Sequence, residues 1–446
     1  MSDDGGRGGF SDSLGFILTA AGTAVGLGCI WRFPYLTAEH GGGLFILCYL
    51  TILLTFGIAL MAVEFAIGRR TGLGVLDAFT NLNPKFKFLG VTCIVVCALS
   101  QPYFAVLGAN ITKYGFMYLS GAGAEAASPG FYSAYIASTF EPLLWLGFYI
   151  IIAGIIVYCG VQGGIERVCK VVLPMEIILI AILVYDCLSL PGAIDGLVYF
   201  LAPHPENFGA DSVLAALGQV FYSLSLGLGV MVTFGSYLNK KANIFKSSGS
   251  AVFFTFIVSM LSGALIVPAS YLYTAGNPAA IGSGGLFESL PLVFSMMPFG
   301  TLTGCAFFIL LASAALTSTI AEFEVVVTAL KDRLGFSRLK GVLIMGIYVF
   351  IVAGIISLGY GVLDWIRIGD MYLLEIFDFV SGTILLPLMV LLICLLVGYF
   401  SRPKIILDEM NLKEKSPLRY GMMVLIKIIC PVCIIIILVT NIIEMF

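Results

Sequence analysis

Charge is scarce in this chain: Asp, Glu, Lys and Arg together make up 11% of the 446 residues, whereas 60% are hydrophobic. A soluble domain of this length needs more charge to cover its surface, so a soluble globular protein is excluded. Histidine is scarcer still, because only His40 and His204 occur, both in predicted loops. A metal or nucleophile site built on histidine is therefore hard to assemble, which argues against an enzyme.

The chain also lacks a strong net charge, and we expect it to lack a secretory leader. Its formal net charge of −3 gives no support to nucleic acid or another strongly charged partner. The Gly-rich start MSDDGGRGGFSDS leads into an apolar stretch without a basic segment or a small-residue cleavage site, so we expect no signal peptide. The eleven cysteines fall mostly within apolar stretches, where we expect them to pack as small hydrophobic side chains.

Long apolar stretches dominate what is present. A helix needs about 20 apolar residues to cross a bilayer, and eleven stretches meet that length. We therefore predict an all-α integral membrane protein with one transmembrane domain, residues 1–446, and only loops outside the bilayer. The predicted spans are residues 12–38, 43–68, 88–121, 143–160, 165–188, 212–238, 243–273, 299–332, 338–358, 371–400 and 418–443.

Basic residues are distributed unevenly between the loops. With a cytoplasmic N-terminus, nearly all of them, such as Arg69, Lys85 and Lys240, fall on the cytoplasmic side, and Arg367 is the basic exception opposite. This distribution obeys the positive-inside rule. We expect a multi-pass protein of the cell membrane with its N-terminus in the cytoplasm and, because eleven is odd, its C-terminus outside.

Two spans are crowded with glycine at their centres: the first, with Gly22, Gly26 and Gly28, and the sixth, with Gly227 and Gly229. Dense glycine weakens a helix. These spans open two consecutive five-helix blocks, residues 12–188 and 212–400, followed by an extra helix at 418–443. Because five is odd, the blocks have opposite orientations, which is typical of inverted-repeat transporters with broken helices. Close packing of unbroken helices through small residues is the alternative.

The string GTAVGLGCIWRFP, from Gly22 to Pro34, closely resembles the first-helix signature of the neurotransmitter:sodium symporter family. EHGGG at 39–43, EFAIG at 64–68, SLSLG at 223–227, LTS at 316–318 and Asp378 extend the resemblance over nearly the whole chain. It implies a LeuT-type inverted repeat with unwound helices 1 and 6, as in eleven-helix prokaryotic members. The implied function is sodium-coupled import of a small amino acid, neutral or hydrophobic, by alternating access.

The resemblance implies one complete sodium site and one defective site. The complete site consists of oxygen ligands, which a hard cation prefers. They are the carbonyls of Gly22, Val25 and Ala314 and the hydroxyls of Thr317 and Ser318. The second would use Ala24, Cys29 and Ser223, but Cys29 replaces an asparagine of the family, and the seventh-helix asparagine falls near Phe254 or Thr255. A thiol is a poor sodium ligand, so we predict a weak or absent second site and a stoichiometry of one sodium ion.

The implied substrate site departs from the family in two places. The third-helix tyrosine falls on Phe104 and the sixth-helix gating phenylalanine on Tyr222, so Tyr222 or Tyr103 supplies the hydroxyl, or both only pack. Glu322 replaces an apolar or tiny residue of the family. Three roles are open for it: contact with a cationic or hydroxylated substrate, proton transfer, or a structural hydrogen bond. The implied substrate-binding residues are Ala24, Gly26, Leu27, Gly28, Ser100, Tyr103, Phe104, Phe221, Tyr222, Ser223, Ser225, Leu228, Ser318 and Glu322.

Charged pairs flank this site in the family, and their counterparts here imply two gates. Arg32 with Asp378 resembles the outer gate, and Arg7 with Asp332 the inner gate, beside Phe10, Ser236 and Tyr237. An anion site resembling that of animal members, formed by Tyr49, Gln219, Ser223 and Ser259, leaves chloride open. Glu64, expected to brace the first helix, and Glu324 are expected to be structural.

Two rival functions remain. One is a carrier of an amine, osmolyte or basic compound, which Glu322 suggests. The other is a sensor or channel that binds the ligand without transporting it, against which the intact gate residues argue.

Overall fold

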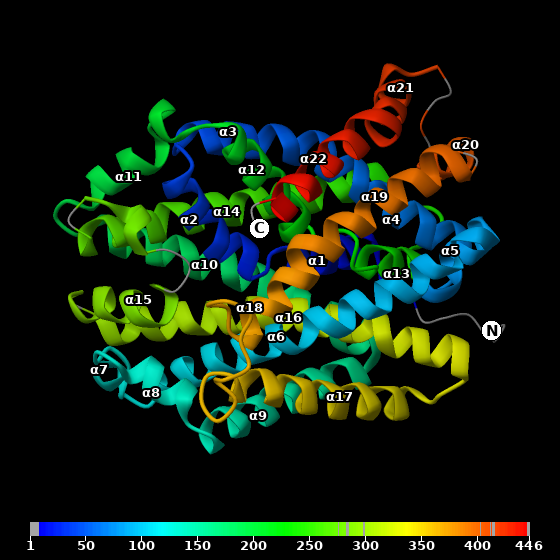
Figure 1. Cartoon of the computed structure of the whole chain (residues 1–446). Coiled ribbons are helices and arrows are strands. Elements are labelled where there is room, and N and C mark those ends of the chain that lie inside the picture. Colours follow the sequence, from blue (N-terminus) through cyan, green and yellow to red (C-terminus); the bar gives the residue numbers. More distant parts are fainter. Residues whose placement is uncertain are drawn as a thin grey trace.

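The computed structural model describes residues 9–274, 276–281, 285–297, 299–401, 403–410, 412 and 415–443. The described chain contains no β-strand beyond two isolated bridges. Most long helices run lengthwise through one bundle (Figure 1). Nine described helical stretches are long and apolar enough to cross a membrane: Gly43–Thr71, Pro84–Leu119, Phe140–Tyr158, Val161–Leu188, Ile244–Tyr273, Gly300–Leu334, Arg338–Leu358, Leu373–Phe400 and Pro417–Thr440.

The remaining two predicted spans are broken helices. In the first, α1 (Ser13–Ala24) meets the segment Gly28–Glu39 at a bend of 54°. That segment comprises the π-helix η1 (Gly28–Arg32) and α2 (Phe33–Glu39). In the sixth, α12 (Ala210–Ser223) and α13 (Val230–Ser236) are separated by residues 224–229 without regular helix. The predicted breaks are confirmed, and the alternative of two unbroken glycine-rich helices is wrong.

The backbone between α12 and α13 explains the glycines there. Gly227 has φ 81° and Gly229 has φ 76°, values in the left-handed region that glycine adopts without steric cost. Ser225, at φ 51°, is the one described residue other than glycine with a positive φ. Three left-handed residues within five positions cannot continue a right-handed helix.

Six helices pack around the breaks: four of them contact the broken segments extensively, and the other two pack against one of those four. Within the spans above they are α4 (Ile58–Thr71), α6 (Lys87–Leu119), α10 (Arg167–Leu188), α14 (Ile244–Tyr273), α16 (Gly300–Leu334) and α17 (Arg338–Leu358). The other spanning helices are α3 (Gly43–Ile52), α9 (Phe140–Tyr158), α18 (Leu373–Asp378), η7 (Phe379–Leu385), α19 (Leu386–Leu395), α21 (Pro417–Val424) and α22 (Cys430–Ile443).

Pro102 lies inside α6, directly before Tyr103 and Phe104. Proline has no N–H to donate, so the carbonyl four residues earlier, on Ala98, loses its helical partner. Tyr348 of α17 replaces that donor, with its hydroxyl 2.7 Å from the Ala98 oxygen. α17 thereby holds the point of α6 from which the site's aromatic side chains project.

The segments between the spans are not only loops, and that part of the prediction is wrong. Short helices occupy both ends of the bundle in Figure 1: α7 (Gly123–Ala126), α8 (Phe131–Ala137), α11 (Ala193–Leu201) and α15 (Gly285–Ser295) on the left, and α5 (Val75–Leu82) and α20 (Pro403–Glu409) on the right. In α5, Val75, Ala78 and Phe79 are buried. This i, i+3, i+4 spacing forms one apolar helical face, which is too short to have signalled a span.

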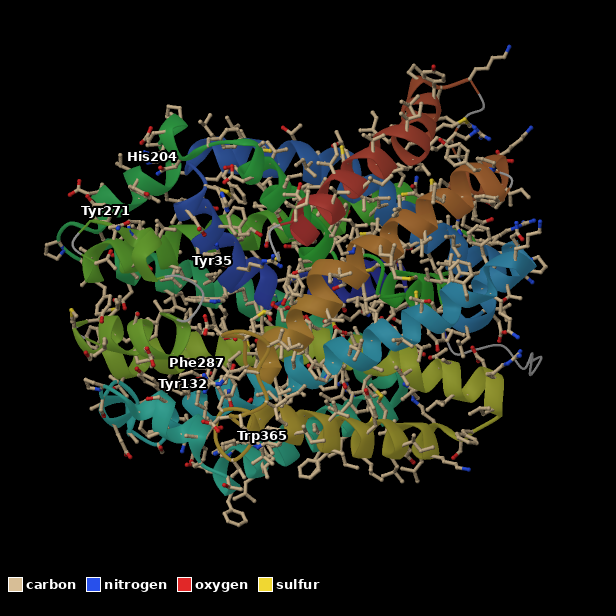
Figure 2. The ribbon with its side chains drawn as sticks, in the orientation of Figure 1. Tyr35, Tyr132, His204, Tyr271, Phe287 and Trp365 are labelled. Atoms are coloured by element: carbon tan, nitrogen blue, oxygen red, sulfur yellow. The ribbon has the colours of Figure 1, made fainter. Side chains whose placement is uncertain are left out.

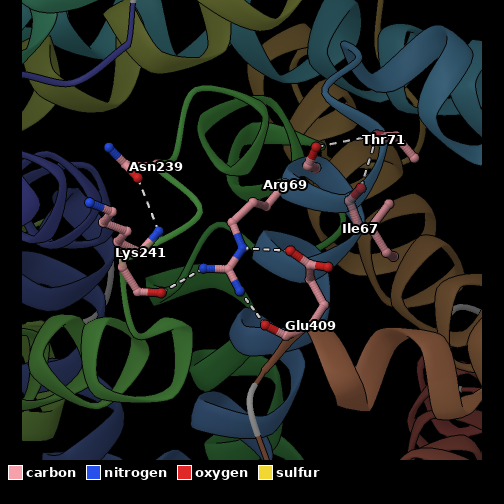
Figure 3. A network of polar contacts seen from close by, with 8 residues as sticks. Ile67, Arg69, Thr71, Asn239, Lys241 and Glu409 are labelled. Carbon is pink, nitrogen blue, oxygen red and sulfur yellow. Dashed lines mark hydrogen bonds and ion pairs between the residues drawn. The ribbon is translucent and has the colours of Figure 1, made fainter.

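The end of the bundle near α5 and α20 (Figure 1), here called the basic end, carries Arg69 and Lys240 beside α20 and Arg333 beside α5. The Arg69 guanidinium ties three segments together there (Figure 3). Its Nε lies 2.8 Å from Glu409 Oε1, one terminal nitrogen donates to the Ala242 carbonyl at 2.5 Å, and the other donates to the Glu409 carbonyl. Because the Arg69 side chain is almost fully buried, removing the Glu409 carboxylate would leave the Arg69 charge unpaired inside the protein.

Candidate functional site

A cavity of about 30 Å³ lies where the two broken helices meet α6, α16 and η7. Its lining contains every predicted substrate-binding residue except Phe221, whose side chain is fully buried in the core. The cavity also has four lining residues that sequence reasoning missed: Thr23, Ser381, Gly382 and Leu386. Two of them, Ser381 and Gly382, could have been predicted, because they are small residues inside an otherwise apolar span.

Glycine at position 26 keeps this cavity open. A Cβ atom there would collide with the Ser318 hydroxyl of α16. At Gly28, a Cβ would lie 2.6 Å from Cδ1 of Tyr222, so the ring rests directly on the η1 backbone. The cavity therefore contains exposed main chain at the α1 break, with no side chain between it and a ligand.

Of the residues predicted for the complete sodium site, Ser318 of α16 lies beside the end of α1, the segment that carries Gly22 and is followed by Val25. Because α1 stops at Ala24, its last carbonyls have no partner within the helix. Ser318 Oγ lies 3.4 Å from the Thr23 carbonyl and 3.3 Å from the Ala314 carbonyl, and Thr317 Oγ1 lies 3.0 Å from the latter. The helix end and α16 thus supply neutral oxygens from two sides, as a hard monovalent cation requires.

The second predicted sodium site differs because a thiol occupies it. Cys29 Sγ is fully buried and donates to the Ala24 carbonyl at 3.4 Å, so a thiol, which is a poor sodium ligand, stands where an oxygen ligand would be needed. Ser223 Oγ accepts from Gln219 Nε2 at 2.8 Å, and Gln219 Nε2 also donates to the Gly28 carbonyl at 2.7 Å. These contacts hold the break together through protein groups alone.

The four residues of the open chloride prediction lie beside Cys29. Tyr49, Gln219 and Ser259 are fully buried, and each leaves one polar atom without a hydrogen bond in the described part of the chain: Tyr49 Oη, Ser259 Oγ and Gln219 Oε1. The serine hydroxyls at 223 and 259 lie near both Cys29 and Tyr49. Any ion bound here would share Ser223 with the second sodium site.

Buried carboxyl and thiol groups support the sixth-helix break. Glu64 Oε1 accepts from the Gly227 amide at 2.8 Å, so this glutamate braces the sixth helix directly, whereas we expected it to brace the first. Cys97 Sγ donates to the Leu228 carbonyl at 3.0 Å, and Cys93 Sγ to the Gly227 carbonyl at 3.6 Å. These two cysteines therefore do more than pack, because they satisfy carbonyls that the unwound segment leaves without helical donors.

An aromatic lid separates the cavity from a larger vestibule of about 430 Å³. Tyr103 and Phe104 stack at 4.6 Å between ring centres, and Phe104 lies 5.9 Å from Tyr222. The Arg32 guanidinium lies 4.8 Å from the centre of the Tyr222 ring, on the vestibule side. Arg32 and Asp378 both line the vestibule, but no ion pair joins these two described residues.

The vestibule opens toward the end of the bundle opposite the basic end. Its walls include Tyr35, Tyr132 and Phe287, which Figure 2 labels in the left half of the molecule. The rings of Tyr132 and Phe287 stack at 4.5 Å, which joins α8 to α15 at the mouth.

At the basic end the path to the cavity is closed by packing. The Phe10 ring packs against Phe16 at 5.1 Å, Phe234 at 6.0 Å and Tyr237 at 6.5 Å. The Tyr237 hydroxyl donates to Glu324 Oε1 at 3.1 Å, and Arg338 donates to both oxygens of the same carboxylate.

Of the predicted inner ion pair, Asp332 accepts from the Gly74 amide at 3.3 Å, whereas Arg7 lies outside the described residues. Ser236 lies in the last turn of α13, where its hydroxyl donates to the Thr233 carbonyl at 2.7 Å.

Residues 7–123 and 139–446 match the sodium:neurotransmitter symporter family. The chain belongs to this family. YhdH, an uncharacterized sodium-dependent transporter of Bacillus subtilis (strain 168), is 34% identical over 96% of each chain. The sodium- and chloride-dependent GABA transporter 2 of Homo sapiens is 26% identical, over 84% of this chain and 70% of its own.

A solved relative agrees in structure as well as in sequence. The crystal structure of MhsT in complex with L-phenylalanine superimposes with a TM-score of 0.89 at 32% identity and covers 98% of this chain and 100% of its own. Membership in the sodium:neurotransmitter symporter family makes this chain a multi-pass, sodium-coupled transporter with the LeuT-type fold, and not an enzyme.

Proposed function

We propose that this symporter imports a small amino acid together with one sodium ion. The observation that carries the proposal is the convergence, at one cavity, of the open α1 end with Gly26 and the amide groups of Leu27 and Gly28. Backbone N–H groups at the start of a helical segment attract anions, so they suit the carboxylate of an amino acid. The relative MhsT was crystallised with L-phenylalanine, which supports an amino acid as the class of substrate.

One sodium ion would bind to Gly22, Val25, Ala314, Thr317 and Ser318. The second site would stay vacant because the Cys29 thiol, a poor sodium ligand, lies beside the Ala24 carbonyl. Binding of sodium would link the end of α1 to α16 and stabilise the state with an open vestibule. Substrate would then allow Tyr103, Phe104 and Tyr222 to close, and rearrangement of the packing around Phe10 and Tyr237 would release both on the other side.

The orientation follows from charge. We place the basic end in the cytoplasm, because Arg69, Lys240 and Arg333 lie there and cytoplasmic loops carry an excess of basic residues. The vestibule then faces outward, and the transporter acts as an importer in the cell membrane.

The experiment is thermal stabilisation of the purified protein by a panel of amino acids and amines, in sodium and in potassium, since a ligand that binds the native state raises its stability. A sodium-dependent shift with amino acids supports the proposal, and no shift in sodium contradicts it. Uptake of the stabilising ligand into proteoliposomes under a sodium gradient then separates a transporter from a sensor.

The second candidate, a carrier of an amine, osmolyte or basic compound, is favoured by the carboxylate of Glu322 in the cavity wall. A response to amines without a carboxylate, and none to amino acids, would select it.

A further inference from the structure

Glu322 differs from the other buried carboxylates of the bundle because its free oxygen faces the cavity. It lies on α16, is 3% exposed and lines the cavity beneath the aromatic lid. Ser100 of α6 donates to its Oε2 at 2.7 Å. No other hydrogen bond to this carboxylate exists in the described chain. In Glu64 and Glu176, too, one carboxylate oxygen accepts a hydrogen bond. The second oxygen of each is fully buried without a hydrogen-bond partner, whereas that of Glu322 is not.

No positive group among the described residues accompanies Glu322. None of the described residues lining the cavity is Lys, Arg or His. Arg32 lies on the other side of the Tyr222 ring and belongs to the vestibule. A carboxylate at this depth in a membrane protein is costly unless it is paired, and functional groups are the usual reason for keeping one. The pairing cation is therefore to be sought in the ligand.

Ser318 and Glu322 are two polar groups of the cavity wall, and their separation suits a side chain of a few methylene groups. Ser318 lies beside the α1 break, 3.4 Å from the Thr23 carbonyl. Glu322 is four residues further along α16, so it lies on the same helical face about 6 Å away. The cavity lining also includes the apolar residues Leu228, Phe104 and Leu386. An apolar stem would contact these residues, as Lys and Arg stems do at protein surfaces.

We propose that Glu322 determines the specificity of this symporter and that the transported amino acid is basic, with an ammonium or guanidinium group that pairs with the Glu322 carboxylate. The inference rests on the proposed amino-acid transport and narrows its substrate class. The backbone amides of Leu27 and Gly28 bind the α-carboxylate, the apolar wall contacts the stem, and Ser100 fixes the orientation of Glu322. A neutral hydrophobic amino acid would leave the carboxylate unpaired.

The test compares ligands that differ only in the terminal charge. Full-length protein in sodium is titrated with L-lysine against L-norleucine and with L-ornithine against L-norvaline, by thermal shift and by competition in proteoliposome uptake. We expect the basic member of each pair to bind at least about tenfold more tightly, as is reasonable for one desolvated charge pair. Equal or tighter binding of the neutral members, or of L-glutamine, overturns the proposal.

Variants then assign the preference to Glu322. Glu322→Gln should remove the preference for the basic ligand while sodium-dependent binding of the neutral one is retained. Glu322→Asp keeps the charge but shortens the side chain, so it should retain the preference and shift it from L-ornithine toward L-lysine. This shift is not expected of a residue with only a structural role, and it also keeps the test valid if Glu322→Gln does not fold. A basic preference that survives in Glu322→Gln contradicts the assignment.

Glu206→Gln removes an exposed carboxylate outside the cavity and serves as the matched control, with ligand preference unchanged. The test also separates this inference from the proposed function. If wild-type protein responds in sodium to neutral but not to basic amino acids, only the basic class fails. If no amino acid is bound in sodium, the proposed function fails as well.

Discussion

Two candidate ion sites lie on either side of the same break in the first helix, and they differ in one kind of atom. At the site formed with α16, the groups offered by Ala314, Thr317 and Ser318 are all oxygens. At the other, the thiol of Cys29 lies among the oxygens and already bonds to one of them. From this comparison we expect one side chain of the wrong ligand chemistry to be enough to weaken an ion site.

The largest effect should come from removing an oxygen of the α16 site. Thr317→Ala deletes a hydroxyl from a site that has only neutral ligands, so we expect sodium affinity to fall by on the order of tenfold or more. The measurement is substrate uptake into proteoliposomes as a function of sodium concentration. Thr319→Ala is the matched control, because its hydroxyl faces Tyr149 at 2.9 Å rather than the site. Unchanged sodium dependence in Thr317→Ala would remove this site from the mechanism.

The next prediction restores the second site. Cys29→Asn replaces the thiol by an amide oxygen, which suits sodium, and frees the Ala24 carbonyl. The Hill coefficient for sodium should rise from about one in the wild type to a value clearly above one, as expected for two coupled sites. Cys29→Ala should stay at the wild-type value. A wild-type Hill coefficient near two would show that the thiol does not block the site.

Chloride should affect uptake less, and its effect should depend on whether the second sodium site is filled. An anion at Tyr49 and Ser259 would be buried without a neighbouring cation while the second sodium site is vacant, and an unpaired buried charge is unfavourable. Replacing chloride by gluconate should therefore change wild-type uptake by less than about twofold, but should reduce uptake by Cys29→Asn more strongly. Strong chloride dependence in the wild type would contradict this link between the sites.

The smallest effect concerns the packing behind the α16 site. A Cβ at Gly22 would lie 3.3 Å from Cβ of Cys169, which is tight. Gly22→Ala should shift α1 slightly away from α10 and weaken sodium affinity by about two- to threefold, through steric strain alone. Adding Cys169→Ala should restore part of the loss in a double-mutant cycle. Additive losses would show that the two positions do not interact.

Sequence alone predicted the architecture well, because the apolar spans and the glycines of the broken helices are local signals. Gly227 and Gly229 indicated the break, and the structure has both in left-handed conformation. The short α5 and α15 were missed because one buried face of two or three turns gives too weak a periodic pattern to be told from a loop. The bond from Gly227 to Glu64 joins residues 163 positions apart, and no local pattern reveals such a contact.

The site was predictable only where a motif existed. Thr317 and Ser318 stand out in sequence, and they lie together beside α1. The role of Cys29 as a donor to Ala24 depends on the direction of one side chain, which spacing does not give. The same holds for Glu322, since its sequence position indicates a costly intramembrane carboxylate, whereas the exposure of one oxygen to the cavity comes only from the packing of α6 against α16.

The thiols of Cys93 and Cys97 allow opening of the sixth-helix break to be followed by cysteine alkylation. Both are fully buried and donate to carbonyls of the unwound segment, so a thiol-specific alkylating reagent has no access while those bonds are closed. Only a thiolate reacts rapidly, and a buried thiol in apolar surroundings stays protonated. The rate at which these natural cysteines are alkylated therefore reports how often the unwound segment parts from α6, without any introduced label.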